Sequence, residues 1–505
     1  MNTTIGAVGP RPDRVRPYLV LVICCMSLLV VSMDATIVNV ALPALRRDLS
    51  SSTAGLQWVI DSYTLVVASL LMMSGSLADR FGRRRTFQIG LAVFTLASVL
   101  CSAAPGLKTL IAFRMLQAVG ASMLNPVAMS IVTNTFLDPK ARARAIGIWS
   151  ATIGVSMAIG PLVGGALTQA IGWRSIFYIN LPLGVAAILL ARKFIPESKA
   201  PHARRVDPVG QILVLAALAS VTYGVIEGPH HGWTSPLIVG MFAVTVASVI
   251  GILVYEPRQA EPLIDLRFFR SVPFTSATVI AVCTFCAFSG YVFLNALYLQ
   301  EVRHFEPFET GLYTLPVALA TIVCAPLSGR LVGRYGTRPS LLMAGASMGL
   351  STLLMTRLDA ETPMATMLVA YVLFGIGFGL VNAPITNTAV SGMPRTRAGL
   401  AAAITATSRQ VGGALGVAIG GTIASSAAIA SVGGGRLGGR SVGPEFPAAT
   451  HAFWWLATAA GLAIVGLALL STSRWAKRST ERIAALLDDA PEASPAAVAV
   501  AGGAR

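Results

Sequence analysis

Charged residues are scarce in this sequence. Asp, Glu, Lys and Arg make up 12% of its 505 residues, whereas soluble globular proteins carry about 25%. Hydrophobic residues make up 54% of the chain. Together these values exclude a soluble globular protein and indicate a chain that folds within a membrane.

Histidine and cysteine are also scarce, which limits the available chemistry. The five histidines have no metal-ligand spacing, and among the six cysteines Cys283 and Cys286 form one CxxC pair with no second pair beside it. We interpret this pair as core packing. The sequence has no recognisable cofactor loop or cluster of Cys, His, Asp and Glu, so we expect neither metal nor cofactor, and a membrane enzyme is disfavoured.

Long apolar segments dominate the chain instead, and each can cross a hydrocarbon core of about 30 Å. They predict an all-α integral membrane protein with fourteen transmembrane helices. The predicted spans are 18–40, 56–76, 86–104, 108–134, 143–169, 174–195, 207–227, 235–255, 272–300, 310–329, 338–357, 363–388, 397–429 and 450–472.

The net charge of +16 would by itself suit a nucleic-acid partner. The basic residues, however, collect in alternate loops such as 79–85, 192–207 and 330–338, and the loops between them nearly balance. This is the positive-inside bias of membrane proteins. It predicts a multi-pass protein of a bacterial inner or plasma membrane with both termini cytoplasmic, and no nucleic-acid partner is needed.

An internal repeat organises the spans. Residues 75–84 read "GSLADRFGRR" and residues 329–338 read "GRLVGRYGTR", each between the second and third spans of a six-span unit. The repeat predicts a 6+2+6 arrangement of two six-helix bundles with two inserted helices. The predicted parts are a tail at 1–17, a bundle at 18–195, a linker with two helices at 196–271, a bundle at 272–472 and a disordered tail at 473–505. Parallel repeats that rock against each other favour a transporter.

Two of the motifs have a direct physical interpretation. In "GSLADRFGRRR" (75–85) the glycines permit a tight turn, and the aspartate can face the positive ends of helices while the arginines stay at the charged surface. In "GVSMAIGPLVGG" (154–165) the glycines allow a partner helix to approach closely, and the proline bends the helix. A loop that only orients the protein remains the alternative for the first motif.

With these motifs the chain resembles the major facilitator superfamily, specifically its fourteen-span branch of drug:proton antiporters. "RMLQAVGAS" (114–122), "GWRSIFYINLPLG" (172–184) and "RQVGGALGVAIGG" (409–421) also carry the likeness. Ala118 and Val119 in span 4 are a small departure. The second copy of the loop has Gly333 in place of the aspartate and keeps the arginines.

The resemblance assigns roles to two sets of residues. It implies a conformational latch between the two halves, made of Gly75, Asp79, Arg80, Gly82, Arg83 and Arg84. It also implies an antiporter motif typical of exporters, made of Gly154, Gly160, Pro161, Gly164 and Gly165.

Three charges lie inside the predicted spans of the first bundle. At 1.5 Å per residue, Asp34, Asp61 and Arg114 fall at a comparable depth, and one arginine cannot balance two carboxylates. This arrangement suits a carboxylate that binds and releases a proton, and the branch keeps an acid at the position of Asp34. We expect Asp34 to be the proton-coupling group held by Arg114, with Asp61 as a second proton site or a counter-charge for cationic substrates. The alternatives are a permanent ion pair of Asp34 with Arg114, and an Asp61 that snorkels to the surface.

Polar and aromatic residues in several spans could line a substrate path for a large amphipathic molecule, although hydrogen bonds between helices would use the same residue types. The candidates are Asn39, Trp58, Tyr63, Gln117, Tyr291, Asn295, Tyr298, Asn382 and Arg409. The spans of the second bundle contain no mid-membrane acid, so the resemblance argues for monocationic, zwitterionic or neutral substrates.

The expected function is proton-coupled antiport that exports amphipathic drugs, dyes or antibiotics, with the proton gradient as energy source. The alternative is a dedicated exporter of an endogenous metabolite, siderophore or lipid that uses the same alternating-access mechanism. A receptor that does not transport is disfavoured, because the antiporter motif would then have no use. We expect a monomer in the lipid bilayer, with a small molecule and protons as its partners.

Overall fold

The computed structural model of the chain describes residues 16–199, 207–259, 262–391, 393, 398–431, 446–473, 475, 476, 478 and 479. The predicted N-terminal tail up to residue 15 and the C-terminal tail from residue 480 lie outside these ranges. The described residues form helices and no strands, in agreement with the predicted all-α class.

Each predicted span coincides with a helical segment. The α-helices are α1 (Pro17–Asp48), α2 (Thr53–Phe81), α3 (Arg83–Ser102), α4 (Leu107–Thr135), α5 (Pro139–Ala170), α6 (Ser175–Tyr178), α7 (Asn180–Phe194), α8 (Pro208–His231), α9 (Pro236–Tyr255), α10 (Val272–Leu297), α11 (Pro307–Tyr335), α12 (Thr337–Met355), α13 (Met364–Val390), α14 (Ala398–Ser431) and α15 (Phe446–Ser471). Short 3₁₀ turns η2 (Glu256–Arg258) and η3 (Leu266–Arg270) follow α9, and a π-helical turn η4 (Tyr298–Val302) extends α10.

Local sequence signals explain where several helices begin. The side chain of Ser52 accepts a hydrogen bond from the Gly55 amide at the start of α2, and Asp207 accepts one from Gly210 at the start of α8. Such N-caps satisfy amide groups that have no partner within the helix. α8 also has Pro208 as its first residue, where the missing N–H costs nothing.

The repeated loop motif makes the same turn twice. α2 ends at Gly82 with φ +113°, and α11 ends at Gly336 with φ +79°; α3 and α12 begin at the next residue. Both glycines adopt the left-handed region that residues with a side chain rarely enter. The repeat in the sequence is therefore also a repeat of backbone conformation.

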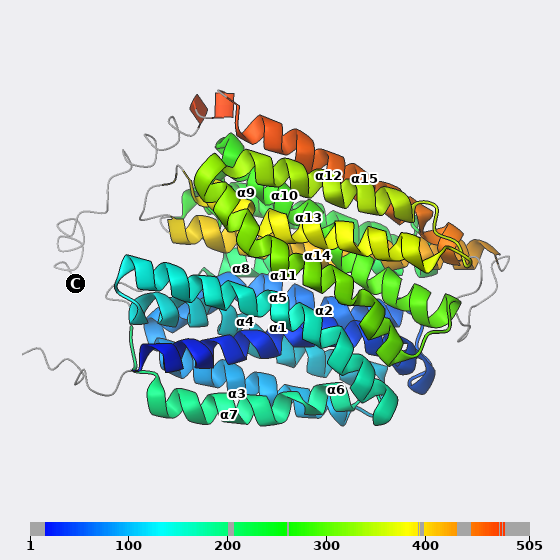
Figure 1. The fold of residues 1–505 in the computed structure, drawn as a ribbon, viewed down its shortest axis with the longest axis horizontal. Coiled ribbons are helices and arrows are strands. Elements are labelled where there is room, and N and C mark those ends of the chain that lie inside the picture. The colour runs from blue at the N-terminus through cyan, green and yellow to red at the C-terminus, as the bar shows by residue number, and fades with distance from the viewer. Residues whose placement is uncertain are drawn as a thin grey trace, which may run out of the picture.

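The helices gather into two groups (Figure 1). The first helix group comprises α1–α7 and the second comprises α10–α15. In the first group α1 packs on α5, α2 on α4 and α3 on α4; in the second, α10 packs on α14, α11 on α13 and α12 on α13. The groups meet where α5 packs on α11 and where α2 packs on α14. In the repeat, α2 is equivalent to α11, and α5 is equivalent to α14. Exchanging equivalent helices therefore turns the α5–α11 contact into the α2–α14 contact, as a two-fold relation between the groups requires. α8 and α9 pack on each other, and α8 lies against α2 and α14.

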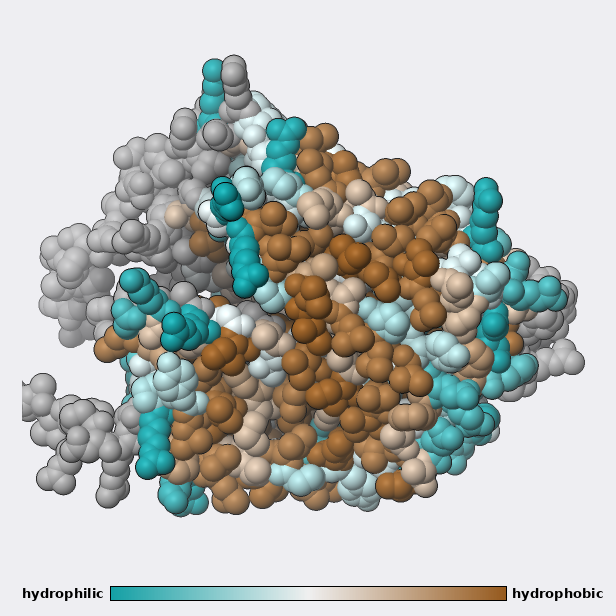
Figure 2. Space-filling model, in the orientation of Figure 1, coloured by the Kyte–Doolittle hydropathy of each residue, from teal (hydrophilic) through white to brown (hydrophobic). Residues whose placement is uncertain are grey.

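On the face shown in Figure 2, hydrophobic side chains cover the middle, and hydrophilic ones gather mainly toward the two ends. Among the described residues, twelve helical segments are long and apolar enough to cross a membrane, counting α6 with α7, α9 with η2 and α10 with η4. α12 and α14 are helical but are not among these twelve. The fourteen predicted spans therefore all correspond to helical segments, and twelve of these segments are long and apolar enough to cross a membrane.

The two ends of the molecule differ in how tightly the groups meet. We call the end where α1 begins the tail end, on the left in Figure 1, and the end where α1 finishes the far end. On the α5–α11 contact a Cβ added at Gly154 would lie 3.0 Å from Ile322. Seven residues nearer the tail end on each helix, Gly147 and Gly329 have no neighbouring atom within 4 Å of such a Cβ. α5 and α11 therefore diverge toward the tail end.

The direct hydrogen bonds between the two groups lie toward the far end. Among described residues they run from Arg46 to Glu301, from Gln57 to the carbonyls of Val417 and Ala418, from Gln300 to the carbonyl of Val40, and from the Phe308 amide to Gln169. α2 and α14 keep apolar contact farther along, where Met72, Leu400 and Ile404 share one cluster. The structure is thus closed at the far end.

Candidate functional site

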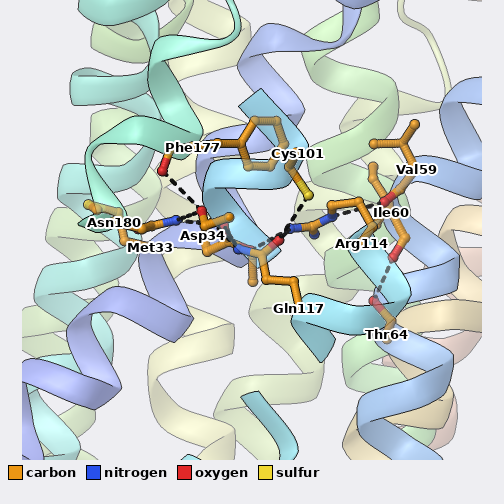
Figure 3. A network of polar contacts seen from close by, with 12 residues as sticks. Met33, Asp34, Val59, Ile60, Thr64, Cys101, Arg114, Gln117, Phe177 and Asn180 are labelled. Atoms are coloured by element: carbon orange, nitrogen blue, oxygen red, sulfur yellow. Dashed lines mark hydrogen bonds and ion pairs between the residues drawn. The ribbon is translucent and has the colours of Figure 1, made fainter. Parts of the chain in front are cut away.

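Asp34 lies at the centre of a buried polar network (Figure 3). Its Oδ2 accepts a hydrogen bond of 2.6 Å from Arg114 Nη1. Its Oδ1 accepts bonds from Gln117 Nε2 at 2.9 Å and from Asn180 Nδ2 at 3.0 Å. The Asp34 and Arg114 side chains are 0% and 2% exposed. The carboxylate is therefore compensated by one positive charge and two amide donors.

Arg114 is held on several sides. Its Nη1 also donates to Gln117 Oε1 at 2.7 Å, and its Nε donates to the Val59 carbonyl at 3.3 Å. The guanidinium lies 4.2 Å from the centre of the Tyr63 ring and 5.8 Å from that of Phe177, where the ring faces attract a cation. Three sequence candidates, Asp34, Arg114 and Gln117, thus form one site with Tyr63 beside it.

Asn180 and Ser98 belong to this network but are not among the candidates predicted from the sequence. Asn180 is the first residue of α7, directly after the break at Ile179 that separates it from α6. Its amide also donates to Ser98 Oγ at 2.9 Å, and Ser98 in turn donates to the Phe177 carbonyl at 3.0 Å. The available signal was the asparagine inside the quoted segment 172–184, because a lone amide within an apolar span needs a polar partner.

Asp61 lies apart from this network. It is fully buried, and neither of its carboxylate oxygens has a hydrogen-bond partner, so it does not snorkel to the surface. Gln57 and Thr64, four residues before and three after it, face α14: Gln57 bonds to α14 carbonyls, and Thr64 lies against Gly413. Asp61 lies between this face of α2 and the face of Trp58, whose indole bonds to Glu227 of α8. An ionised carboxylate without a partner is costly to bury, so Asp61 differs from Asp34, whose carboxylate is compensated by Arg114.

The glycines of the antiporter motif bring α5 against two helices. A Cβ added at Gly160 would lie 2.1 Å from Thr36 Oγ1, and one at Gly164 would lie 2.5 Å from Ile37, both on α1. At Gly165 the Cβ would lie 2.3 Å from the Pro307 carbonyl oxygen on α11. Only a residue without a side chain allows these approaches. α5 therefore connects the segment just after Asp34 to the second helix group.

The carbonyl of Pro161, in the same motif, lies 2.4 Å from where a Cβ would stand on Gly311 of α11. Gly154 meets α11 at Ile322, as described above. Each residue of the predicted motif thus lies on a helix face that contacts α1 or α11.

The loop between α2 and α3 is pinned within the first helix group. Asp79 pairs with Arg83 at 2.9 Å. Glu197, which follows α7, accepts hydrogen bonds from the amides of Arg84 and Arg85, at 3.1 and 3.3 Å, and lies 2.6 Å from where a Cβ would stand on Gly82. Glu197 is not among the latch residues predicted from the sequence.

The latch residues make their described polar contacts on the first group's own side. Arg80 lies over the Phe81 ring at 5.9 Å, and Gly75 has no neighbouring atom within 4 Å of an added Cβ. The hydrogen bonds and ion pairs of this loop with other described residues do not reach the second group. In this conformation the loop does not connect the two groups through them.

The candidates on α10 and η4 make contacts within the second helix group. The Tyr291 ring stacks on Phe374, with 4.3 Å between the ring centres. Asn295 Oδ1 accepts a hydrogen bond of 2.5 Å from the Tyr371 hydroxyl. The Tyr298 hydroxyl donates to a backbone carbonyl that follows α12. All three side chains are buried in this packing.

The other candidates divide between the two groups. Arg409 donates to Thr386 Oγ1 at 2.6 Å and to the Asn382 carbonyl at 3.4 Å, so these candidates of α13 and α14 lie together. Asn39 donates to carbonyls of its own helix, the nearer at 3.2 Å. Trp58 faces α8, where its indole N–H donates to Glu227 at 2.9 Å.

The sequence profile described as Major Facilitator Superfamily matches residues 24–417. The chain belongs to this superfamily. Over 406 residues it is 38% identical to the "Multidrug resistance protein Stp" of Mycobacterium tuberculosis (strain CDC 1551 / Oshkosh), with 80% of this chain and 75% of that protein covered.

The chain is also similar to a second named relative and to a solved structure. The chain is 35% identical to the "Tetracenomycin C resistance and export protein" of Streptomyces glaucescens, over 82% of this chain and 77% of that one. Its fold matches a bacterial homologue of the human lysosomal transporter Spinster, solved in an inward-facing and unoccupied conformation, with a TM-score of 0.61 at 20% identity over 94% of this chain and 99% of the other.

These findings define the protein class. The superfamily member is a multi-pass membrane transporter for small molecules and not an enzyme, and its bacterial relatives place it in the cell membrane. Among the described residues, no group of three or more His, Cys, Asp or Glu side chains could hold a metal ion.

Proposed function

We propose that this transporter is a proton-coupled antiporter of the fourteen-span branch that exports amphipathic drugs, dyes or antibiotics. The buried Asp34–Arg114 pair supports the coupling: an acid this deep, with a compensating arginine, has a cost that a purely structural role does not require. The names of the relatives, which refer to drug resistance and export, support the substrate class.

In the proposed cycle a proton competes with Arg114 for Asp34. Protonation of the carboxyl would remove the charge that holds the guanidinium, while Gln117 and the Val59 carbonyl still accept from Arg114. α1 packs against α5 at Gly160 and Gly164 and α5 reaches α11, so a change at Asp34 can affect the contact between the groups.

Asp61 is the proposed second proton site. It is buried one turn after Gln57, which bonds to α14, and its carboxylate oxygens have no hydrogen-bond partner while the groups are closed at the far end. When the α2–α14 contact opens, water can reach the carboxyl group and the proton can leave. A cationic substrate could then use the ionised form as a counter-charge.

The proposed topology has the tail end in the cytoplasm. The basic loops after α2 and α7 lie there, which agrees with the positive-inside bias. We propose that α12 and α14 also span the membrane, which gives a 6+2+6 arrangement, that the protein acts as a monomer, and that this conformation opens toward the cytoplasm. The α2–α3 loop would then latch the groups in the opposite conformation.

Inside-out vesicles test the proposal. Vesicles with wild-type protein or Asp34→Asn are given a proton gradient, and uptake of ethidium is followed before and after the gradient is collapsed. We expect gradient-dependent uptake by the wild type and loss of it in Asp34→Asn at equal expression. Equal uptake by both would make Asp34 structural, and Asp61→Asn would then be the variant that loses coupling.

The second candidate function is export of a single endogenous compound by the same mechanism. One observation favours it: a relative of 35% identity is named for resistance to, and export of, one compound. A panel of chemically unrelated cations, zwitterions and neutral antibiotics separates the two candidates. Uptake of several classes supports drug export, and uptake of none supports the dedicated exporter.

A further inference from the structure

Arg409 is an arginine deep within the helices of the second group. It follows Ala398, the first residue of α14, by eleven residues, which corresponds to about 16 Å along the helix. Its Nη2 donates to Thr386 Oγ1 at 2.6 Å and to the Asn382 carbonyl at 3.4 Å. Both acceptors are neutral. Among the ion pairs between described residues, none includes Arg409.

The guanidinium of Arg409 also keeps hydrogen-bond donors without partners. An arginine side chain has five N–H donors, and Nη2 carries two of them. The Nε of Arg409 is buried and has no hydrogen-bond partner, and its Nη1 donates to none of the described residues. Arg114, the buried arginine of the first group, has Asp34 as its counter-ion. A charge at this depth is costly, so an anion at Arg409 would supply the compensation that Arg114 already has.

The described carboxylates of the protein do not supply that anion in this structure. Those of the second helix group lie at the far end, at residues 301–309 and 359–361. On the antiparallel helix α2, Thr64 lies 3.6 Å from where a Cβ would stand on Gly413, so Arg409 is level with α2 about four residues after Thr64. Asp61 is therefore about seven residues, or about 10 Å, nearer the far end than Arg409.

Arg409 lies on the side of the second group that adjoins the first. At 3.6 residues per turn, its position around α14 falls between those of Gly412 and Gly413. An added Cβ at Gly412 would lie 2.4 Å from a carbonyl oxygen of α10, and Gly413 faces Thr64 of α2. Thr386, which accepts from Arg409, is exposed one turn before α13 ends. The guanidinium is therefore close to the tail end, where α5 and α11 diverge.

An aromatic wall adjoins this guanidinium. The centre of the Phe285 ring lies 5.9 Å from Arg409 Cζ. Phe378 packs edge-on against Phe285, with 5.4 Å between the ring centres, and stacks on Phe288 at 4.3 Å. Phe285 and Phe288 are half-buried, so part of each ring is accessible. Apolar ring surface beside donors of positive charge suits an aromatic molecule that carries an anionic group.

We propose that Arg409 and this aromatic wall form a binding site for an amphipathic aromatic molecule with an ionised carboxyl group. The carboxylate accepts hydrogen bonds from the donors of Arg409 that have no partner here, and the aromatic part lies against Phe285. Hydrogen bonds between ionised partners are roughly twice as strong as neutral ones, so the carboxylate decides which compounds bind well. The site thus selects aromatic acids and zwitterions within the proposed export of amphipathic compounds, on which the assignment rests.

Ligand binding to the purified protein in lipid nanodiscs tests the site. Naphthoate, which is ionised at neutral pH, is compared with its uncharged methyl ester by equilibrium dialysis, and binding to empty nanodiscs is subtracted. We expect the wild type to bind the acid about tenfold or more tightly than the ester, and Arg409→Gln to bind both equally because only the acid is weakened. Phe285→Leu should weaken both ligands, since the ring contacts the part that they share.

Arg303 offers a matched control in the same helix group. It also donates to two backbone carbonyls, those of Ala360 at 3.2 Å and Thr362 at 2.8 Å, and it lies 6.0 Å from the centre of the Phe305 ring. It belongs to the far end, however, and lies outside the proposed site. Arg303→Gln should leave both dissociation constants within about twofold of wild type. An equal loss of acid binding in Arg303→Gln and Arg409→Gln would reduce the effect to net charge and overturn the site.

Three other results would overturn the site: no saturable binding of naphthoate by the wild type, equal affinity of the wild type for acid and ester, or an undiminished preference for the acid in Arg409→Gln. If Arg409→Gln does not fold, the wild type alone decides. Acidification that protonates naphthoate should weaken it to the level of the ester, whereas naphthalenesulfonate stays ionised and should still bind. Equal weakening of both would contradict recognition of the anion.

The binding assay needs neither a proton gradient nor transport. A failed carboxylate site therefore leaves the vesicle test of export unaffected. Conversely, absence of gradient-driven uptake leaves the difference between acid and ester, and its dependence on Arg409, valid.

Discussion

The contact between Gly160 and α1 supports a quantitative prediction about Gly160→Ala. The new Cβ would lie 2.1 Å from Thr36 Oγ1, 3.2 Å from Thr36 Cβ and 3.4 Å from the Met33 carbonyl oxygen. An ordinary contact of this kind needs 3.4–4 Å, so α1 and α5 must separate by about 1 Å unless the hydroxyl moves. Overpacking of this kind costs about 1–3 kcal/mol.

The hydroxyl cannot easily turn away, because Thr36 Oγ1 donates to the Met33 carbonyl at 3.1 Å. Removing it should relieve most of the strain. In the double variant Gly160→Ala with Thr36→Ala, the closest neighbour of the new methyl is the residue 36 Cβ at 3.2 Å. We therefore expect the double variant to be more stable than Gly160→Ala alone, although Thr36→Ala by itself adds no contact.

Thermal unfolding in detergent, followed by fluorescence-detected gel filtration, measures the stability, and proton-driven ethidium uptake measures the activity. Gly147→Ala is the matched control on the same helix, since nothing lies within 4 Å of its added methyl. We expect wild-type stability for Gly147→Ala and a clear loss of both stability and uptake for Gly160→Ala. A Gly160→Ala variant as stable as Gly147→Ala, or no rescue by Thr36→Ala, would refute the close-packing argument.

Two further predictions concern the turns of the repeat and the interior of the second group. Gly82→Ala and Gly336→Ala both strain a left-handed backbone, at a cost of about 1–2 kcal/mol, but Gly82→Ala also places its methyl 2.6 Å from Glu197 Oε1, whereas Gly336→Ala meets no atom within 4 Å. Gly82→Ala should therefore have the lower unfolding midpoint in detergent, and equal midpoints would contradict the role of Glu197. Tyr371→Phe should destabilise the protein by about 1–3 kcal/mol, because Asn295 Oδ1 loses the 2.5 Å bond that it accepts in a buried place; an unchanged midpoint would mean that the ring alone matters.

Much of the site could be inferred from single residues, and the inference was incomplete for a physical reason. Asp34 and Arg114 were paired from their depth along two helices, and the structure places them 2.6 Å apart. Asp61 has a comparable expected depth, yet it takes no part in the hydrogen bonds around this pair, and its carboxylate oxygens have no hydrogen-bond partner. Depth follows from residue number, whereas the direction of a side chain around the helix axis depends on how the helices pack.

The hydrogen bonds of α10 illustrate the same limit. Tyr291, Asn295 and Tyr298 are residue types that suit both a substrate path and hydrogen bonds between helices. The structure shows Asn295 bonded to Tyr371 of α13. The partner lies 76 residues away in the chain, and no local pattern in the sequence predicts such a contact.

By itself the sequence determined the positions of the helices, the duplicated turn at Gly82 and Gly336, and the small residues at which α5 approaches its neighbours. These properties are local: hydropathy sets where a helix can cross the membrane, and a missing side chain sets where the backbone can turn or another helix can come close. Tertiary structure alone decided that Asp61 is separate from Asp34 and that Arg46 meets Glu301. Both depend on the packing of helices distant in the chain, where rotation about each helix axis and the two-fold relation of the groups choose the partners.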